Sequence, residues 1–389
     1  MELKMQSDFA VVAERTSTTQ EQLGTCDLRM IQSPTGMELY ITATPPAGDS
    51  QRQARGMYDR IALTLRNAGA FIVQERLFAS ADAMVPALVS RAESYGDLDD
   101  GVMPTLLATR SGTGQIVGAQ VHAVAGIRRP RVLASGDSPV ARAFDCAGYH
   151  YLVASGLSAP QLDGGAAQTR CALGQAESLL AQAGGSLCDI ARTWIWMDDI
   201  LAWYPQLNQA RTAFFTQRGL MDVPGRMPAS TGIGVSPAVG RVGIDVFAAW
   251  GAQDAVGRFH AAGNQRSAYE YGSAFARAAR VKTPGGVTVF CSGTAAIDAK
   301  GNTCFLDDVQ GQVRMTVQNI GAVLRDMDCC DNDVVHAMAY CATPQVEAHF
   351  IAHYSHELPW PCLTMVGDVC RDNLLFEIEV TACPNARKV

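Results

Sequence analysis

The feature that most constrains the fold is a pattern of strands and helices that the chain runs through three times. Each pass has the order strand, long helix, strand, short helix, strand, strand. The passes begin near residues 38, 149 and 287. Runs rich in β-branched residues predict the strands, and apolar residues at helical spacing predict the helices between them. The alternative is ordinary strand–helix patterning that coincides by chance.

The predicted elements follow the same order in all three passes. In the third pass they lie at 287–297, 307–327, 334–340, 344–354, 361–369 and 374–381. In the second pass they lie at 149–158, 166–183, 190–197, 204–218, 227–235 and 242–249. The first pass matches more loosely, at 38–44, 51–68, 71–78, 82–95, 104–110 and 116–124.

Three such units need a shared way to bury their sheets. A sheet with helices on one face must cover its other face as well. Three sheets can do so by meeting around a common axis, as the subunits of a homotrimer do. The sequence therefore predicts an α/β (α+β) chain that forms its own pseudo-trimer and acts as a monomer. We expect units at 1–130, 140–255 and 280–389, with a connector at 256–279 that contributes to substrate binding.

The composition fits a well-packed globular protein. Of the 389 residues, 48% are hydrophobic and 18% are charged, which argues against disorder. The net charge of −7, without a basic run, argues against nucleic acid as a partner. A small carboxylated substrate remains compatible with it, because a few arginines can gather locally in an acidic protein.

Targeting and cysteine signals point to a cytoplasmic protein. The first residues lack a basic stretch followed by an apolar one, so no secretory signal is expected. No apolar run is long enough to predict a membrane span. The 12 cysteines are spread over a long chain without disulfide or CxxC spacing, which predicts reduced thiols and no zinc site. No nucleotide-binding glycine motif occurs, so we expect no cofactor.

Three motifs of the third pass resemble those of a known superfamily. FCSGTAAIDAKGNT (290–303), the long helix after it, and DVCRDNLLFEIEV (368–380) resemble the Rid superfamily of reactive-intermediate deaminases. The resemblance implies a chorismate-mutase-like α/β unit that forms trimers, with active sites between the units.

A narrower resemblance covers residues 149 to 389. PASTGIG (228–234), NQRSAYEYGSAFARA (264–278) and CRDNLLFEIE (370–379) resemble the chorismatases, the chorismate-hydrolysing branch of the superfamily. Chorismatases are single-chain imitations of the Rid trimer, which agrees with the three passes.

The chain also departs from these families. Rid deaminases hold the substrate carboxylate with an arginine on the fifth strand, where this chain has Leu363 and, in the middle pass, Ser230. The glutamate of the EIE motif is kept only as Glu377; the middle pass has Gly243-Ile244-Asp245 there, and the first pass Val117-Gly118-Ala119. The segment between Tyr269 and Phe275 is shorter than in chorismatases.

Glu377 and Cys370 are the predicted catalytic residues. A carboxyl on a mostly apolar strand should have a raised pKa, because burial disfavours its charged form, and this suits a general acid. The resemblance implies that Glu377 protonates the enolpyruvyl methylene carbon and that Cys370 shapes the pocket of a 3-hydroxybenzoate-forming enzyme. The alternatives are a structural ion pair for Glu377 and a small core thiol for Cys370.

Arginines and tyrosines are the predicted substrate ligands. Guanidinium groups suit carboxylates because they bind them with two parallel hydrogen bonds. Arg277 is the first candidate, followed by Arg371 and Arg226, and the hydroxyls of Tyr269 and Tyr271 could donate hydrogen bonds.

The resemblance implies an enzyme of secondary metabolism that cleaves the enolpyruvyl ether of chorismate to pyruvate and a hydroxybenzoate, expected to be 3-hydroxybenzoate. Two alternatives stay open. One is a Rid-like enzyme that hydrolyses or rearranges an enamine, an imine or another reactive biosynthetic intermediate. The other is a non-catalytic binding protein with the Rid fold.

Overall fold

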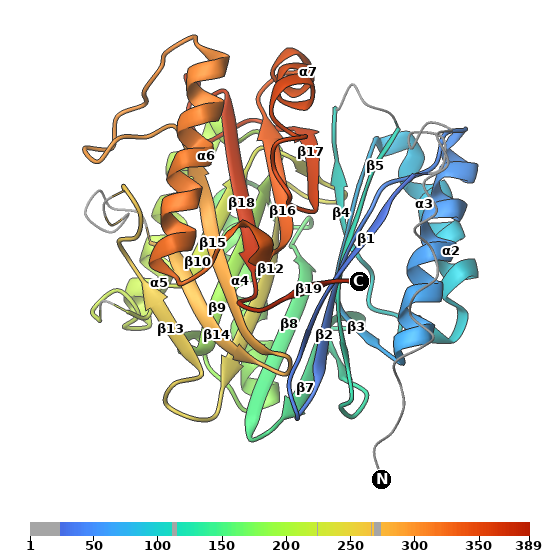
Figure 1. Ribbon diagram of the computed structural model, residues 1–389. Helices are drawn as coiled ribbons and strands as arrows, with labels where there is room; N and C mark the ends of the chain where they lie inside the picture. The colour runs from blue at the N-terminus through green and yellow to red at the C-terminus, as the bar shows by residue number, and fades with distance from the viewer. Residues whose placement is uncertain (1–23, 111–114, 224, 266, 268–273) are drawn as a thin grey trace.

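The structure is a computed structural model that describes residues 24–110, 115–223, 225–265, 267 and 274–389. Within these residues the chain forms three mixed sheets, each with helices on one face (Figure 1). The three passes read from the sequence correspond to the three sheets. This confirms the predicted α/β fold of three Rid-like units.

The first sheet has the strand order β11-β4-β3-β5-β2-β1-β19, and α2 and α3 cover it. Its elements are β1 (Cys26–Gln32), β2 (Met37–Ala43), α2 (Ser50–Ala68), β3 (Phe71–Ala79), α3 (Ala81–Tyr95), β4 (Thr105–Ala108) and β5 (Ile116–Ala125). The two outer strands come from elsewhere in the chain: β11 (Ser236–Pro237) and β19 (Arg387–Lys388).

The second sheet has the order β10-β9-β12-β8-β7-β6, and α4 and α5 cover it. Its elements are β6 (Arg131–Ser135), β7 (Ser138–Cys146), β8 (Tyr149–Leu157), α4 (Gly165–Ala183), β9 (Ile190–Met197), α5 (Ile200–Gln217), β10 (Ala229–Ile233) and β12 (Val242–Trp250).

The third sheet has the order β13-β14-β15-β18-β16-β17, and α6 and α7 cover it. Its elements are β13 (Val256–Phe259), β14 (Ala278–Thr283), β15 (Gly286–Ala295), α6 (Val309–Asp326), β16 (Val334–Cys341), α7 (Pro344–His353), β17 (Cys362–Val366) and β18 (Phe376–Ala382). Strand β13 lies within the stretch expected to be a connector.

Most helices begin where the sequence offers a capping side chain. A side-chain oxygen before the first turn accepts a hydrogen bond from a backbone N–H that the helix leaves unpaired. The caps are Asp49 for α2, Asp199 for α5, Asp308 for α6 and Thr343 for α7. Helix α5 begins at Ile200, four residues before its predicted start at Tyr204, because its first turn precedes a kink at Trp203.

The helix-free faces of the three sheets pack against one another at the centre. This shared core takes apolar and aromatic side chains from every unit, including Phe78, Trp196, Phe247, Phe290 and Tyr340. The rings of Phe247 and Phe290, from the second and third sheets, are 5.0 Å apart. The three sheets therefore bury one another's helix-free faces, as expected for a pseudo-trimer.

Backbone contacts also join the units. Strand β11 follows the second unit's β10 but pairs with β4 of the first sheet, and the carboxy-terminal β19 pairs with β1. Between the second and third units, isolated bridges link Ala229 to Ala276 and Gly234 to Asp368. Among the described helices, none is long and apolar enough to cross a bilayer.

Candidate active site

Sheet register shows which residues of the other units lie at the position of Glu377. In each unit the residue at this level of the last long strand faces an aromatic residue of the neighbouring strand: Glu377 faces Tyr340, Gly243 faces Trp196, and Gly118 faces Phe78. Only the third unit therefore carries a carboxyl at this position.

In the first unit, a side chain from the third unit lies against the position that corresponds to Glu377. A Cβ built on Gly118 would lie 2.9 Å from a methyl group of Leu363, which comes from β17 of the third unit. Leu363 is the residue that replaces the Rid arginine. An apolar side chain thus lies against the position that corresponds to Glu377, where the first unit has no carboxyl.

Glu377 lies at the seam between the second and third units. Its side chain projects from β18 toward the backbone of Gly293 on β15 and the methyl group of Thr231 on β10. Only 6% of the residue is exposed. Among the described residues, no hydrogen-bond donor reaches its carboxyl.

This environment raises the pKa of Glu377 to about 8. Burial is the main cause, because it disfavours the charged form, and the negative charge of Glu379 adds to it. Arg277 and Arg192 act in the opposite direction. The carboxyl is therefore largely protonated at neutral pH, which is the form a general acid needs.

Two buried arginines lie beside the ring of Phe275. The guanidinium carbons of Arg277 and Arg211 are 5.3 Å and 6.0 Å from the ring centroid. The two residues are 5% and 3% exposed. Arg211 comes from α5 and donates to Asn208 Oδ1 at 2.7 Å. The predicted ligand Arg277 is thus joined by an arginine that sequence reasoning missed.

A visible sequence signal pointed to Arg211. It lies four residues after Leu207 and four before Phe215, on the face of α5 that packs into the core. A charged residue on the apolar face of a helix is unusual unless it has a partner or a function. The position could therefore have been recognised from periodicity alone.

Cys370 and Tyr204 lie close enough to Glu377 for their charges to interact. Burial, and then the charge of Glu377, raise the pKa of the Cys370 thiol to about 12. Burial also raises the pKa of Tyr204 on α5, with further contributions from Cys370 and Glu377. Both groups are neutral at physiological pH. Cys370 packs against apolar clusters of the second and third units, as a residue that shapes a wall would.

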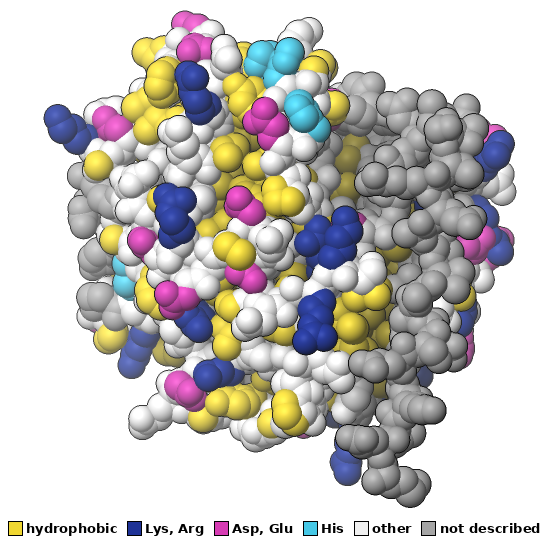
Figure 2. Space-filling model, viewed as in Figure 1, with side chains coloured by type: hydrophobic (Ala, Val, Ile, Leu, Met, Phe, Trp, Pro, Cys, Tyr) yellow, Lys and Arg dark blue, Asp and Glu magenta, His cyan; other side chains and the backbone are white. Residues whose placement is uncertain are grey.

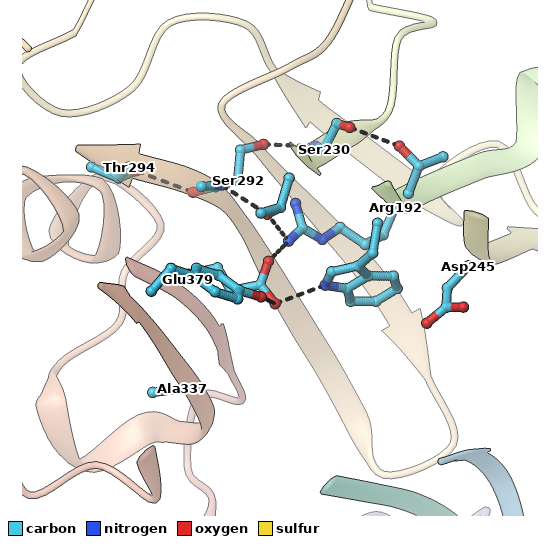
Figure 3. A network of polar contacts seen from close by, with 12 residues as sticks. Arg192, Ser230, Asp245, Ser292, Thr294, Ala337 and Glu379 are labelled. Atoms are coloured by element: carbon cyan, nitrogen blue, oxygen red, sulfur yellow. Dashed lines mark hydrogen bonds and ion pairs between the residues drawn. The ribbon is translucent and has the colours of Figure 1, made fainter. Parts of the chain in front are cut away.

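A hydrogen-bonded set of hydroxyls joins the two units beside these residues (Figure 3). The backbone N–H of Ser230 on β10 donates to Ser292 Oγ of β15 at 2.8 Å, and Gly293 N–H donates to Thr231 Oγ1 at 3.0 Å. Ser292 Oγ in turn donates to the carbonyl of Ala276 at 2.6 Å. These bonds hold β10 against β15 and so fix the backbone of Gly293, against which Glu377 packs.

The remaining predicted ligands lie elsewhere or outside the described residues. Arg371 donates to the carbonyl of Gly301 at 2.9 Å and so holds the loop after β15. It is not among the groups that shift the pKa of Glu377. Arg226 is exposed. Tyr269 and Tyr271 fall outside the residues that the structure describes.

Metal-binding clusters and cavities were the other features that could mark a site. Among the described residues, no group of three or more His, Cys, Asp and Glu side chains could hold a metal ion. An open cavity of about 530 Å³ lies between the end of α4 and β13, lined by residues such as His150, Trp250 and Arg258. None of the candidate site residues lines it.

On the face drawn in Figure 2, basic and acidic side chains are interspersed in the described part of the surface.

Part of the chain is similar to a known protein family. The family model described as Endoribonuclease L-PSP, the domain of Rid proteins, matches residues 274–383. A search of curated protein sequences found no match.

Solved structures extend the comparison to most of the chain. A chorismatase crystal structure aligns over 80% of this chain and 93% of its own, with a TM-score of 0.59 and 20% identity. The yeast protein YEO7 aligns over 33% of this chain and 98% of its own, with a TM-score of 0.28 and 16% identity. A putative endoribonuclease from Thermotoga maritima aligns over 32% and 95%, with a TM-score of 0.26 and 20% identity. Residues 274–383 are therefore similar to the Endoribonuclease L-PSP family, and over 80% of its length the chain has a fold similar to that of the chorismatase structure.

Proposed function

We propose that this protein is a cofactor-independent, chorismatase-like enzyme that cleaves the enolpyruvyl ether of chorismate, or of a close carboxylated analogue, to pyruvate and a hydroxybenzoate. One observation carries the proposal. Glu377, a buried carboxyl with a pKa of about 8, lies at a seam whose walls include the buried arginines Arg277 and Arg211.

In the proposed reaction Glu377 donates its proton to the methylene carbon of the enol ether. Protonation of this carbon produces an oxocarbenium ion, and the newly ionised Glu377 lies beside that positive charge. A low-dielectric site strengthens this attraction. Water can attack the oxocarbenium carbon to give a hemiketal, which releases pyruvate and a dihydroxycyclohexadiene carboxylate that becomes a hydroxybenzoate by loss of water. Alternatively, the neighbouring ring hydroxyl attacks the ring carbon that bears the ether, the C–O bond to pyruvate breaks, the hydroxyl proton returns to Glu377, and the resulting epoxide rearranges to the hydroxybenzoate. No redox step occurs, so proton transfer and positioning suffice.

The two arginines account for substrate recognition. Chorismate has two carboxylates, and Arg277 and Arg211 offer two guanidinium groups beside one aromatic ring. A buried guanidinium binds a carboxylate strongly, because water does not compete for its N–H groups. The ring of Phe275 also provides an apolar surface against which a cyclohexadiene ring can pack.

Cys370 favours 3-hydroxybenzoate as the product. Its thiol is neutral and packed, so we assign it the role of excluding water rather than that of a nucleophile. Exclusion of water favours attack by the ring hydroxyl. We also propose that the chain works as a monomer in the cytoplasm, because its own three units already surround one another.

A second candidate is hydrolysis of an imine or enamine intermediate. The match of residues 274–383 to the L-PSP family supports it. The carboxylate anchor of Rid deaminases is replaced by Leu363 and Ser230, so Arg211 or Arg277 would have to supply a new one.

A coupled assay distinguishes these functions. Purified protein is incubated with chorismate, and pyruvate is followed through lactate dehydrogenase, in parallel with Glu377→Gln. Pyruvate release that the substitution abolishes supports the first function. Because glutamine matches the neutral carboxyl in size, the variant should fold normally, and an exposed Glu357→Gln variant controls for the substitution itself. If neither protein releases pyruvate, the chorismatase proposal fails, and a panel of 2-aminoacrylate-type substrates tests the second.

A further inference from the structure

Two carboxyls of β18 point the same way but have opposite surroundings. Glu377 and Glu379 are two residues apart on one strand, so their side chains share a face. Both are 6% exposed. Two like charges this close in a buried site disfavour each other, so one carboxyl tends to hold the proton. Which one holds it depends on the hydrogen bonds that each receives.

Glu379 receives three hydrogen bonds from the described part of the chain. Arg192 on β9 donates to Glu379 Oε2 at 2.5 Å, the indole of Trp194 to Oε1 at 3.0 Å, and Tyr340 Oη to Oε1 at 3.2 Å. In Figure 3, Glu379 faces Arg192 across the seam. Donors of this kind stabilise the ionised carboxylate, and a guanidinium does so most strongly.

Glu377 receives no such support from the described residues. The groups that act on it from neighbouring elements are Arg277 before β14, Tyr204 on α5, Cys370 in the loop before β18, Tyr340 on the adjacent strand β16, and Arg192 on β9 of the second sheet. Of these, the cationic arginines favour ionisation of Glu377 and burial opposes it. The charge of Glu379 on the same face adds to the opposition.

We propose that the Arg192–Glu379 pair is the positioning element of this site: it keeps the negative charge on Glu379, so that the proton of the carboxyl pair stays on Glu377. Arg192 belongs to the second unit, which has no carboxyl of its own at the seam position. The second unit thereby sets the protonation state of the acid in the third. This inference rests on the proposed function of Glu377 as a proton donor.

A similar arginine–carboxylate pair lies between the first and second units, but no second carboxyl lies beside it on its strand. Asp245 has the register position of Glu379 in the second unit and accepts a hydrogen bond from Arg76 at 2.9 Å. The residue two positions before it is Gly243. The Arg76–Asp245 pair therefore only joins the first and second units, whereas Arg192–Glu379 also faces a protonatable carboxyl.

Glu379→Gln tests the proposal. The substitution removes the negative charge beside Glu377 and leaves Arg192 without its carboxylate, and both changes favour ionised Glu377. We expect the protonated-carboxyl band of Glu377 in the infrared spectrum of ¹³C-glutamate-labelled protein to lose about half of its intensity or more at pH 7. The alkaline limb of the kcat/KM profile should move to lower pH by on the order of one unit or more. Glu377→Gln identifies the band.

Glu75→Gln is the matched control. Glu75 is 1% exposed and accepts from Arg91 at 2.9 Å and from Tyr95 Oη at 3.1 Å, within the first unit. This variant loses a buried arginine–glutamate pair in the same way. It should be destabilised without a change in the band or in the pH limb.

The outcomes separate this inference from the proposed function. If Glu379→Gln is destabilised but Glu377 titrates as in the wild type, the pair only joins the units and the inference is overturned. It is also overturned if the wild-type protein shows no protonated Glu377 at neutral pH. A band that shifts as expected in a protein that releases no pyruvate supports the inference and contradicts the function. If Glu379→Gln does not fold, Trp194→Phe removes one donor to Glu379 and should weaken the Glu377 band partially, and an unchanged band would count against the inference.

Discussion

The carboxyl of Glu377 occupies the space that a side chain at Gly293 would need. A Cβ built on Gly293 would overlap Glu377 Oε1 and would also come within 3.1 Å of the methyl group of Thr231. The carboxyl therefore packs directly on the backbone of β15. Glycine is required here by close approach rather than by backbone conformation, since strands are otherwise weakened by glycine.

Gly293→Ala should displace the acid and remove activity. The added methyl group cannot fit beside the carboxyl, so Glu377 must take another rotamer, and a displacement of about 1 Å can cost on the order of 100-fold in rate. We expect a loss of this size in pyruvate release, measured as kcat. Gly174→Ala is the control, because a Cβ there meets no atom within 4 Å, and in helix α4 alanine should stabilise by up to about 1 kcal/mol. Wild-type activity in Gly293→Ala would mean that the acid does not use this position.

Glu377→Gln should change the pH dependence of stability. The pKa of Glu377 is about 8 in the folded protein and near 4.5 for an unperturbed glutamate, so the unfolded state ionises first. The wild type therefore loses stability relative to the variant as the pH rises from about 5 to 8. The difference should reach roughly 3–5 kcal/mol above pH 8 and vanish near pH 4.5.

Thermal unfolding of both proteins at pH 5.5, 7 and 8.5 measures this difference. The variant should have the higher Tm at alkaline pH, and the gap should narrow as the pH falls. A constant gap across the three values would show that the carboxyl is not buried in its neutral form.

Sequence reasoning predicted the repeating part of the fold. Each unit buries a regular pattern of strands and helices, and such periodicity is local and visible in the chain. The sequence also predicted that the first and second units lack the carboxyl, because the repeated pattern aligns Gly118 and Gly243 near the position of Glu377. The missed strands are those that lie before each repeat or cross between units, such as β1, β7, β11 and β19. Their partners are distant in sequence, so no local pattern marks them.

The candidate site was predictable only in part. Glu377 and Arg277 lie in motifs that could be matched, and the helical spacing of α5 marks Arg211 as a charged residue on an apolar face. Arg192 comes from the second unit and reaches the site only after the units pack. The pairing of Arg192 with Glu379 joins residues far apart in the chain. Contacts of this kind depend on how the sheets meet, and neither hydrophobic spacing nor motif content reports that geometry.

Cys370 should resist alkylation in the folded protein. Burial and the neighbouring Glu377 raise the pKa of its thiol to about 12, so little thiolate exists at pH 8. Cys330 is exposed and offers an internal comparison. We expect iodoacetamide at pH 8 to modify Cys330 first and to leave Cys370 unmodified until the protein unfolds, as measured by peptide mass spectrometry. Equal labelling of the two residues would contradict the assignment of Cys370 to a packed wall.

Arg277→Met and Arg211→Met should weaken substrate binding. Each substitution keeps the length of an apolar stem but removes a guanidinium that is buried beside Phe275. A hydrogen bond to a charged group contributes about 1.5–3 kcal/mol, so each variant should raise KM for chorismate by roughly 10-fold or more. The effect should be smaller for an analogue that lacks one carboxylate, because one of the two arginines then has no partner to lose. Arg170→Met, on the exposed side of α4, is the control and should leave KM unchanged. If Arg211→Met alters only Tm and leaves KM at the wild-type value, this arginine holds α5 in place and the two-carboxylate clamp is wrong.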